Sequence, residues 1–264
     1  MRNLSIYLSL SILCLMGCSS GQKNLGYKVD YQNENLTMKG YFASVDDGNT
    51  KKPGILVVHE WWGHNEYARK RADMLAKEGY VALAVDMYGD GLQANHPSKA
   101  MEFSSAVFKN IDEAKSRFLA ALETLKAHPH VDKSRIAAIG YCFGGGVVLT
   151  MARMGIDLDG VVSYHGSLKS PVKAKVGSVK GNILVFNGAA DPLVSKKDIS
   201  NFKKEMKNAK VKLEYTDLPG AKHAFTNPDA TELGKKFPNL PLAYNKEADD
   251  LSWARTLSFF KEIF

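Results

Sequence analysis

The sequence predicts an α/β fold with a mostly parallel central sheet of about eight strands and helices on both of its faces. Short apolar runs of strand type alternate with segments of helical periodicity along most of the chain. Most of these runs are continuously apolar, which is typical of strands buried on both faces of a parallel sheet. The first two strand candidates, 26–32 and 36–44, are separated only by a short turn and predict an antiparallel hairpin.

Local signals support the individual elements. Gly79 ends the first helical segment, and Ser195 is a candidate N-cap for a later one. Apolar residues at helical spacing over 97–125 predict two helical pieces, whereas 211–218 alternates as a strand does. After the hairpin, we expect strands at 54–59, 80–85, 136–139, 160–164, 182–187 and 211–218. We expect helices at 66–78, 97–125, 147–153, 195–208 and 244–264.

Length and composition indicate one large domain. The chain has 264 residues, 45% of them hydrophobic, and α/β domains of roughly 200–250 residues are common. The formal charge is +7, but the lysines are scattered and no nucleic-acid-binding motif is present. We interpret the charge as solvated surface, with nonspecific attraction to an anionic membrane as the weaker alternative. We expect a monomer and no nucleic-acid partner.

Residues 1–17 have the features of a signal peptide. Arg2 supplies a positive charge, and the apolar stretch after it is too short to span a membrane comfortably. The stretch ends in Leu-Met-Gly-Cys, which resembles a bacterial lipobox and implies cleavage after Gly17 and lipidation of Cys18. We expect an exported protein anchored by that lipid in the cell envelope, with Ser19 favouring the outer membrane and the periplasmic side. The alternative is a plain cleaved signal peptide in which Cys18 is incidental.

This processing would leave a polar tether, 18–24, and a folded domain, 25–264. Cys14 would be removed and Cys18 blocked, so Cys142 would be the one thiol of the domain. No disulfide could form within it, and a lone thiol in an oxidising compartment is at risk of oxidation. Its presence is easier to understand if the thiol has a function.

Cys142 lies in a pattern typical of a nucleophile elbow. Gly140 and Gly144 flank it at two residues on either side, between a predicted strand and a predicted helix. Such a sharp turn holds the central residue in a strained conformation, and larger flanking residues would collide with the strand and helix. The helix N-terminus would favour a thiolate and a developing oxyanion. The alternative is a buried structural cysteine beside an ordinary glycine-rich turn.

Two further residues follow later strands in the order required for a catalytic triad. Asp191 comes just after 182–187, and His223 comes after 211–218. In parallel sheets the carboxyl ends of the strands share one edge, so the three side chains can converge there. The order nucleophile, acid, histidine is that of the α/β-hydrolase arrangement. Taken singly, Asp191 could be a turn or helix-capping residue, and His223 a surface histidine.

With these residues in view, the chain closely resembles the dienelactone hydrolase family of α/β hydrolases, from about residue 25 to 264. The resemblance implies an α/β-hydrolase fold and a triad of Cys142, Asp191 and His223. It also implies that Glu60 meets the thiol and controls its ionisation, and that the backbone N–H groups of Trp61 and Phe143 form the oxyanion hole. The motifs that carry it are His59–Glu60–Trp61–Trp62–Gly63, Ala84–Gly89, Gly140–Gly145, Gly188–Pro192, His223–Phe225 and Tyr244–Asn245.

The resemblance weakens where the substrate would bind. The diene-lactone enzymes hold a substrate carboxylate with arginines, whereas here one of those positions is Asn227 and the region 92–102 has no arginine. Since a neutral amide does not replace a bidentate guanidinium, we do not expect diene lactone itself as the substrate. Trp62, Tyr88 and Asn227 are candidates for the substrate pocket, although the aromatic residues could equally serve packing. His64 is open to a substrate-binding or an incidental role.

We expect no cofactor and no metal. The histidines lack paired ligand spacing, and neither a phosphate loop nor a dinucleotide fingerprint is present. The leading hypothesis is a lipid-anchored cysteine hydrolase that cleaves small esters or lactones through an acyl-enzyme. The alternative is a noncatalytic envelope binding module that keeps the fold as a scaffold.

Overall fold

A computed structural model of the chain describes residues 25–45, 48 and 50–264. The predicted signal peptide, the tether and Cys18 lie outside the described residues. None of the helices in the described part of the chain is long and apolar enough to cross a membrane.

The described residues form an eight-stranded sheet, which confirms the predicted fold class. Its strands lie in the spatial order β1-β2-β4-β3-β5-β6-β7-β8. β1 and β2 form the expected antiparallel hairpin, β2 also pairs antiparallel with β4, and every other pair is parallel. The strands are β1 Gly26–Asn33, β2 Leu36–Ala43, β3 Lys52–Val58, β4 Val81–Val85, β5 Val131–Tyr141, β6 Gly160–Tyr164, β7 Asn182–Gly188 and β8 Leu213–Leu218.

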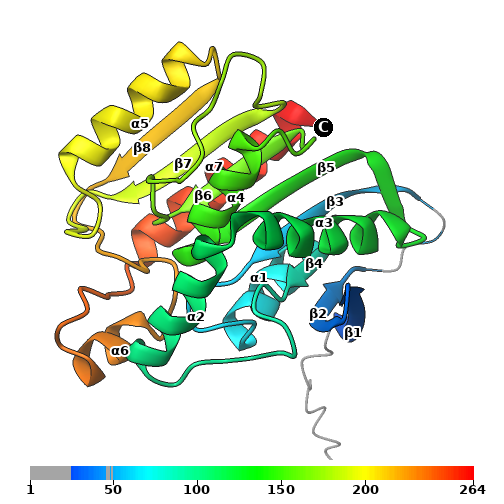
Figure 1. The fold of residues 1–264 in the computed structure, drawn as a ribbon, viewed down its shortest axis with the longest axis horizontal. Coiled ribbons are helices and arrows are strands. Elements are labelled where there is room, and N and C mark those ends of the chain that lie inside the picture. The colour runs from blue at the N-terminus through cyan, green and yellow to red at the C-terminus, as the bar shows by residue number, and fades with distance from the viewer. Residues whose placement is uncertain (1–24, 46–47, 49) are drawn as a thin grey trace, which may run out of the picture.

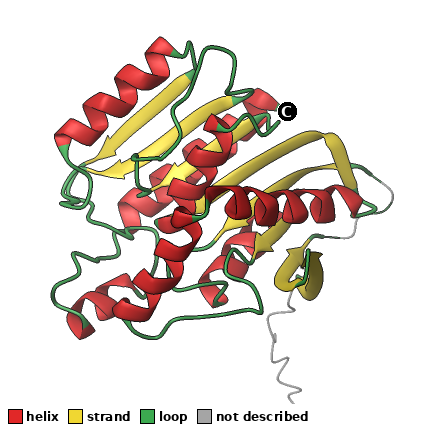
Figure 2. Ribbon diagram, in the orientation of Figure 1, coloured by secondary structure: helices red, strands yellow, loops and turns green. Residues whose placement is uncertain are grey.

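Helices cover both faces of this sheet (Figures 1 and 2). One core layer packs α3, α4 and α5 against the sheet, and the opposite layer packs α1 and α7. In Figure 1 the first group lies in front of the strands and the second behind them. The helices are α1 Glu66–Lys77, α2 Pro97–Lys109, α3 Ile111–Ala127, α4 Phe143–Arg153, α5 Lys196–Asn208, α6 Ala230–Lys236 and α7 Lys246–Ile263.

The continuously apolar runs behave as predicted for strands covered on two sides. Ile55 and Val57 of β3 face the layer of α1 and α7, whereas Leu56 and Val58 face the layer of α3 to α5. All four side chains are fully buried. Alternate residues of one strand therefore enter opposite cores, and the carboxyl ends of β3, β5, β6, β7 and β8 are left together at one edge.

Helix α6 was not predicted from the sequence. It has seven residues and a glycine at position 234, so local propensity gives little signal. Tertiary packing holds it, because Ala230 and Leu233 join a small cluster with Trp62 and Leu242. This cluster lies beyond the carboxyl edge of the sheet, where α2 and α6 approach each other.

Several strand boundaries also differ from the prediction, most of them by one or two residues. β5 begins at Val131, well before the apolar run at 136–139, because its polar first half pairs with the start of β3. β8 begins at Leu213 rather than at 211. Ser195 caps α5 as expected, through a capping box in which its hydroxyl accepts from the Asp198 N–H at 3.1 Å.

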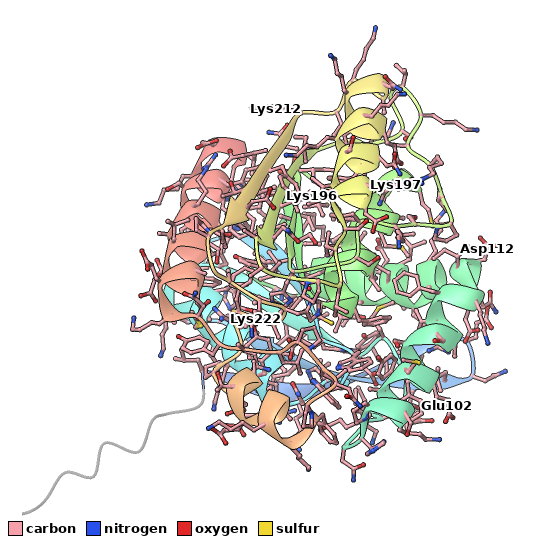
Figure 3. The ribbon with its side chains drawn as sticks, turned by 90° about the vertical axis from the view of Figure 1, so that its left-hand side faces the viewer. Glu102, Asp112, Lys196, Lys197, Lys212 and Lys222 are labelled. Atoms are coloured by element: carbon pink, nitrogen blue, oxygen red, sulfur yellow. The ribbon has the colours of Figure 1, made fainter. Side chains whose placement is uncertain are left out.

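The charged side chains lie on many different elements (Figure 3). The residues labelled there come from α2, α3, the start of α5, the turn before β8 and the loop that precedes His223: Glu102, Asp112, Lys196, Lys197, Lys212 and Lys222. Positive and negative groups are interspersed over this face.

Candidate active site

Cys142 occupies a strained turn between β5 and α4. Its backbone has φ 52° and ψ −114°, in a region that residues other than glycine rarely adopt. A Cβ on Gly140 would lie 2.1 Å from the carbonyl oxygen of Gly144, and a Cβ on Gly144 would lie 2.3 Å from that of Val58. The two glycines therefore permit the close contact between strand and helix that forces the turn, as the spacing predicts.

The structure brings the three predicted triad residues into one hydrogen-bonded row. Nε2 of His223 lies 3.1 Å from Sγ of Cys142, and Nδ1 lies 2.7 Å from Oδ2 of Asp191. The second carboxylate oxygen of Asp191 accepts a hydrogen bond from the N–H of Leu193 at 2.8 Å. Both oxygens are thereby fixed, and the carboxylate holds the imidazole with Nε2 toward the sulfur.

The surroundings of His223 favour its protonated form. Burial alone would lower its pKa, but the Cys142 sulfur and the Asp191 carboxylate outweigh burial and raise the pKa well above the usual value of 6.5. A cation between these two groups is the arrangement expected of a thiolate–imidazolium pair.

A cavity of about 510 Å³ opens at the sulfur. Its surface is mostly apolar, and Lys109 is its one fully charged side chain apart from the triad histidine. Three hydroxyl groups add some polarity. The lining residues are Trp61, Ser104, Ser105, Phe108, Lys109, Cys142, Phe143, Ser167, Leu193, Val194 and His223. An apolar cavity with a few polar groups at a nucleophile is typical of a small-molecule site.

Glu60 is buried beside this site, but its partner differs from the one that the resemblance implies. Its Oε2 accepts a hydrogen bond of 2.7 Å from Nδ2 of Asn227, and within the described residues no hydrogen bond joins it to Cys142. Burial raises the pKa of Glu60 to about 7, although Asn227 and nearby His223 and Arg71 oppose the rise. Its carboxyl group can therefore change charge near neutral pH.

The described residues contain no group of three or more histidine, cysteine or acidic side chains that could hold a metal ion.

Comparison with known proteins agrees with this geometry. The Dienelactone hydrolase family matches residues 38–264. The chain belongs to the dienelactone hydrolase family. This assignment makes it a hydrolase with the α/β-hydrolase fold.

Relatives and solved structures of this family span nearly the whole chain. "Protein usf" of Aquifex pyrophilus is 26% identical over 90% of this chain and 99% of its own length. A Saccharolobus solfataricus protein named "Putative carboxymethylenebutenolidase" is 24% identical over 89% of this chain and 98% of its own. The crystal structure of a dienelactone hydrolase-like promiscuous phosphotriesterase from metagenomic libraries is 33% identical, covers 90% of this chain and 98% of that one, and superposes with a TM-score of 0.83.

The backbone N–H groups of Trp61 and Phe143 are the donors that the resemblance implies for an oxyanion hole. Both residues line the cavity with Cys142, and Phe143 is the first residue of α4. Neither N–H donates to another group within the described part of the chain, whereas Gly144 N–H donates to the His59 carbonyl. Two residues that line the cavity thus have backbone N–H groups without an acceptor among the described residues.

The structure does not place the three tentative pocket residues on the cavity. Trp62 packs against Phe237 in the cluster beyond the sheet edge. The Tyr88 hydroxyl donates to the Trp61 carbonyl at 2.9 Å, so Tyr88 holds the backbone of the loop that contains Trp61. Asn227 holds Glu60, as described above. Trp62, Tyr88 and Asn227 therefore pack or hydrogen-bond beside the site and are not among the residues that line this cavity.

His64 also lies away from the cavity lining. It is buried, and burial lowers its pKa to about 3. Its Nε2 has no hydrogen-bond partner among the described residues. These features fit a neutral packed side chain better than a substrate-binding one.

Sequence reasoning missed a buried histidine directly beneath the elbow. His165 follows β6 and is fully buried, and its Nδ1 lies 3.1 Å from the backbone N of Cys142. The available signal was its place, since it comes immediately after a predicted strand at the same edge as the triad. Metal-ligand spacing was the wrong test for it, because its partners are a backbone N–H and the hydroxyl of Thr226.

Proposed function

We propose that the protein hydrolyses small carboxylic esters or lactones through the thiolate of Cys142. The observation that carries this proposal is the row Cys142–His223–Asp191, with its sulfur facing an apolar cavity. Membership of the dienelactone hydrolase family supports the reaction class. The Saccharolobus relative named "Putative carboxymethylenebutenolidase" also supports a hydrolase.

In the acylation step, Sγ of Cys142 attacks the substrate carbonyl carbon. The carbonyl oxygen becomes an oxyanion and accepts hydrogen bonds from the N–H groups of Trp61 and Phe143. His223 donates its Nε2 proton to the departing alkoxide, the C–O bond breaks, and an S-acyl thioester remains on Cys142. With a lactone, the alcohol stays attached to the acyl group.

In the deacylation step, neutral His223 accepts a proton from a water molecule, whose oxygen attacks the thioester carbonyl. The same two N–H groups hold the second oxyanion, and collapse releases the acid and restores the thiolate. Asp191 fixes the imidazole and stabilises its cation in both steps. Glu60 adds a negative charge near this pair when it ionises, which is how we propose that it influences the charge of the thiol.

The mostly apolar cavity favours substrates with an apolar acyl or alcohol group, and Lys109 is the one lysine or arginine among its lining residues. The cavity has no arginine, and the asparagine at position 227 is turned to Glu60 rather than to the cavity. We therefore propose simple esters or lactones rather than diene lactone. A thioester is a variant within the same mechanism.

The test compares p-nitrophenyl acetate turnover by the purified full-length chain with that of Cys142→Ala and Cys142→Ser. We expect turnover by the wild type, its loss on treatment with iodoacetamide, and no turnover above background by either variant. Serine lacks the acidity of a thiol, and we propose that this site is arranged for a sulfur anion, so turnover by Cys142→Ser should fall severely. Cys18→Ser is the matched control, because it replaces a cysteine that lies outside the described residues.

Undiminished turnover by Cys142→Ser would contradict the assigned nucleophile. Absence of turnover by the wild type over a broad ester and lactone panel, with a slowly alkylated Cys142, would support the noncatalytic binding module instead.

A second candidate activity is cleavage of phosphotriesters. The solved structure named as a promiscuous phosphotriesterase is 33% identical to this chain, and the cavity here is apolar and lacks arginine. A neutral triester carries no charge that needs a cation, and the same sulfur could attack phosphorus in place of carbon. Release of p-nitrophenol from diethyl p-nitrophenyl phosphate, abolished in Cys142→Ala, tests this activity; turnover surviving that change would reject it for this site.

We also propose that the mature protein is anchored in the cell envelope by a lipid on Cys18. The proposal rests on the lipobox-like Leu-Met-Gly-Cys sequence alone. Cys18→Ala should release the exported protein into the soluble fraction, as measured by fractionation and by mass spectrometry of the N-terminal peptide. Retention of the variant at the membrane would contradict lipid anchoring.

A further inference from the structure

We infer that His165 is a positioning residue of this hydrolase, which fixes the strained backbone of Cys142 and ties it to the loop that carries His223. The inference rests on the proposed function for its catalytic meaning. Its geometric basis is a buried chain of hydrogen bonds from Cys142 through His165 to Thr226.

The hydrogen bonds define which nitrogen of His165 carries the proton. A backbone N–H can only donate, so Nδ1 accepts from the N–H of Cys142 at 3.1 Å, and this N–H is shared with the Tyr164 carbonyl at 3.0 Å. The single proton of the neutral ring then lies on Nε2, which donates to Oγ1 of Thr226 at 2.7 Å. If Nδ1 carried a proton, that hydrogen would face the backbone hydrogen of Cys142, and the hydrogen bond between the two residues would be lost.

The position of the His165 ring is fixed on several sides. His165 itself has φ 40°, and its N–H donates to the Phe186 carbonyl at 2.8 Å. A Cβ on the next residue, Gly166, would lie 2.7 Å from the Cα of Gly145. The segment after β6 is therefore pressed against the first turn of α4, and the imidazole has no room to leave the elbow.

Thr226 links the ring to the histidine loop. It is fully buried and lies three residues after His223. Its hydroxyl is 2.6 Å from that of Tyr67, and its carbonyl accepts from Arg71, which also pairs with Asp249 of α7 at 2.7 Å. The loop is thus held by helices on the far side of the sheet from α4.

Together these contacts form a buried connection between Cys142 and the loop that carries His223. The direct contact between Cys142 and His223 is a single 3.1 Å approach at the cavity floor. His165 supplies a second connection, through the backbone of one residue and the loop of the other. Strain at Cys142 persists only where neighbouring groups hold it, and His165 is one of those groups.

The charges that face His165 keep it neutral. Its ring meets that of His223 edge-on, with centroids 5.3 Å apart, and Arg71 lies on the far side. Phe225 and Tyr141 complete the surroundings with apolar rings. Burial, then the His223 and Arg71 charges, lower the pKa of His165 well below 6.5.

The test uses variants that separate the two hydrogen bonds. His165→Asn keeps an acceptor near the Nδ1 position and tolerates a positive φ, whereas His165→Leu keeps volume and loses the acceptor. Thr226→Val removes the hydroxyl at constant shape, and Thr226→Ser retains it. The readouts are the rate of iodoacetamide alkylation at Cys142, followed by peptide mass spectrometry from pH 5 to 9, and kcat and KM for p-nitrophenyl acetate.

We expect His165→Leu to lower kcat about 10–100-fold with little change in KM, and to slow alkylation at Cys142 near neutral pH. His165→Asn should recover most of both rates. Thr226→Val should show a smaller loss, and Thr226→Ser should match the wild type. A purely structural role would lower thermal stability in step with volume, without rescue by asparagine.

Rates within twofold of wild type in His165→Leu, or equal losses in the leucine and asparagine variants, would overturn the inference. If His165→Leu does not fold, the threonine pair decides, and equal rates for Thr226→Val and Thr226→Ser would reject the link. The alkylation rates remain informative if the wild type turns over no ester. Failure of the proposed function and failure of this inference are therefore distinguishable.

Discussion

His165 and His223 are two buried imidazoles with ring centroids 5.3 Å apart, yet their surroundings drive them to opposite charge states. Burial opposes a positive charge in both. For His223, the sulfur of Cys142 and the carboxylate of Asp191 outweigh burial and raise the pKa well above 6.5. For His165 no anion is in contact, and burial with the neighbouring cations lowers the pKa well below 6.5.

The comparison shows that the hydrogen-bond partners of a buried histidine, rather than the extent of its burial, decide whether its ring can be protonated. The ring of His223 lies between two acceptors, so it can hold and release a proton. One nitrogen of His165 faces the N–H of Cys142, so the ring must stay neutral and can only hold its neighbours in place. The first is suited to proton transfer and the second to positioning.

The largest expected effect is at His223. His223→Asn should lower kcat/KM for p-nitrophenyl acetate about 10³–10⁴-fold, because it removes both the partner of the thiolate and the base for deacylation. Alkylation of Cys142 at pH 7 should slow as well. The same substitution at the neighbouring histidine, His165→Asn, serves as the control and should keep most of the activity. If His223→Asn lowered kcat/KM less than tenfold, the assignment of proton transfer to His223 and positioning to His165 would be contradicted.

The next effect is at the carboxylate that makes the two histidines different. Asp191→Asn should lower kcat about 10²–10⁴-fold, since an amide neither stabilises the imidazolium nor fixes its tautomer. The measurement is a pH profile of kcat with a thermal melt of the same samples. Asp250→Asn, an exposed carboxylate on α7, is the control for losing a negative charge. Equal kcat values for Asp191→Asn and wild type would show that His223 needs no orienting partner.

Substitution of Glu60 should have a smaller effect, which is on the free energy of unfolding. Its pKa is raised by burial from 4.5 to about 7, so the folded chain holds a proton that the unfolded chain releases between these pH values. The contribution of Glu60 to the free energy of unfolding is therefore fully present below pH 4.5 and is lost as the pH rises through 7. Glu60→Gln keeps an acceptor for Asn227 and should be more stable than wild type at pH 8, by up to about 3 kcal/mol.

Urea unfolding at pH 4.5 and pH 8 checks this expectation for Glu60→Gln. The difference from wild type should be small at pH 4.5 and large at pH 8. Glu66→Gln, on the exposed face of α1, should show no comparable gain on raising the pH. A pH-independent difference for Glu60→Gln would indicate that the carboxyl keeps an ordinary pKa.

The fold and the hydrogen-bonded row Cys142–His223–Asp191 could be predicted from the sequence because each depends on local signals. Continuous apolar runs mark buried strands, and the glycines around Cys142 mark a turn that only small residues allow. Asp191 and His223 were then placed by topology, since loops after parallel strands share one edge. Glu60 was placed beside the site by resemblance, but its hydrogen bond to Asn227 was not foreseen.

The supporting residues could not be predicted because their partners are distant in sequence and chemically ordinary. Thr226 acts through its hydroxyl and Tyr88 through a bond to the Trp61 carbonyl, and neither pairing has a spacing to detect. Aromatic residues near a motif suggest a pocket, but Trp62 turns toward Phe237 of the unpredicted α6 segment. Tertiary packing decided each of these positions.

The smallest effect on activity is expected at the opposite end of the same strands. Oδ2 of Asp159, just before β6, accepts from the N–H of Ile136 at 2.7 Å, and the strand from there to Cys142 spans roughly 15–20 Å. Asp159→Ala should lower stability by about 1–3 kcal/mol, because it leaves that N–H without its partner, and Tm should fall by roughly 2–10 °C. Turnover should be unchanged below the melting range.

Asp159→Asn retains an acceptor oxygen and should recover most of the lost stability, which separates the hydrogen bond from the charge. The contrast with His165 is then direct, because Asp159 and His165 flank β6 at its two ends, and each binds a backbone N–H of β5 or of the residue just after β5. If Asp159→Ala also slowed alkylation of Cys142 while still folded, strain would be transmitted along the whole strand. The positioning assigned to His165 would then be a general property of β5 and not of that ring.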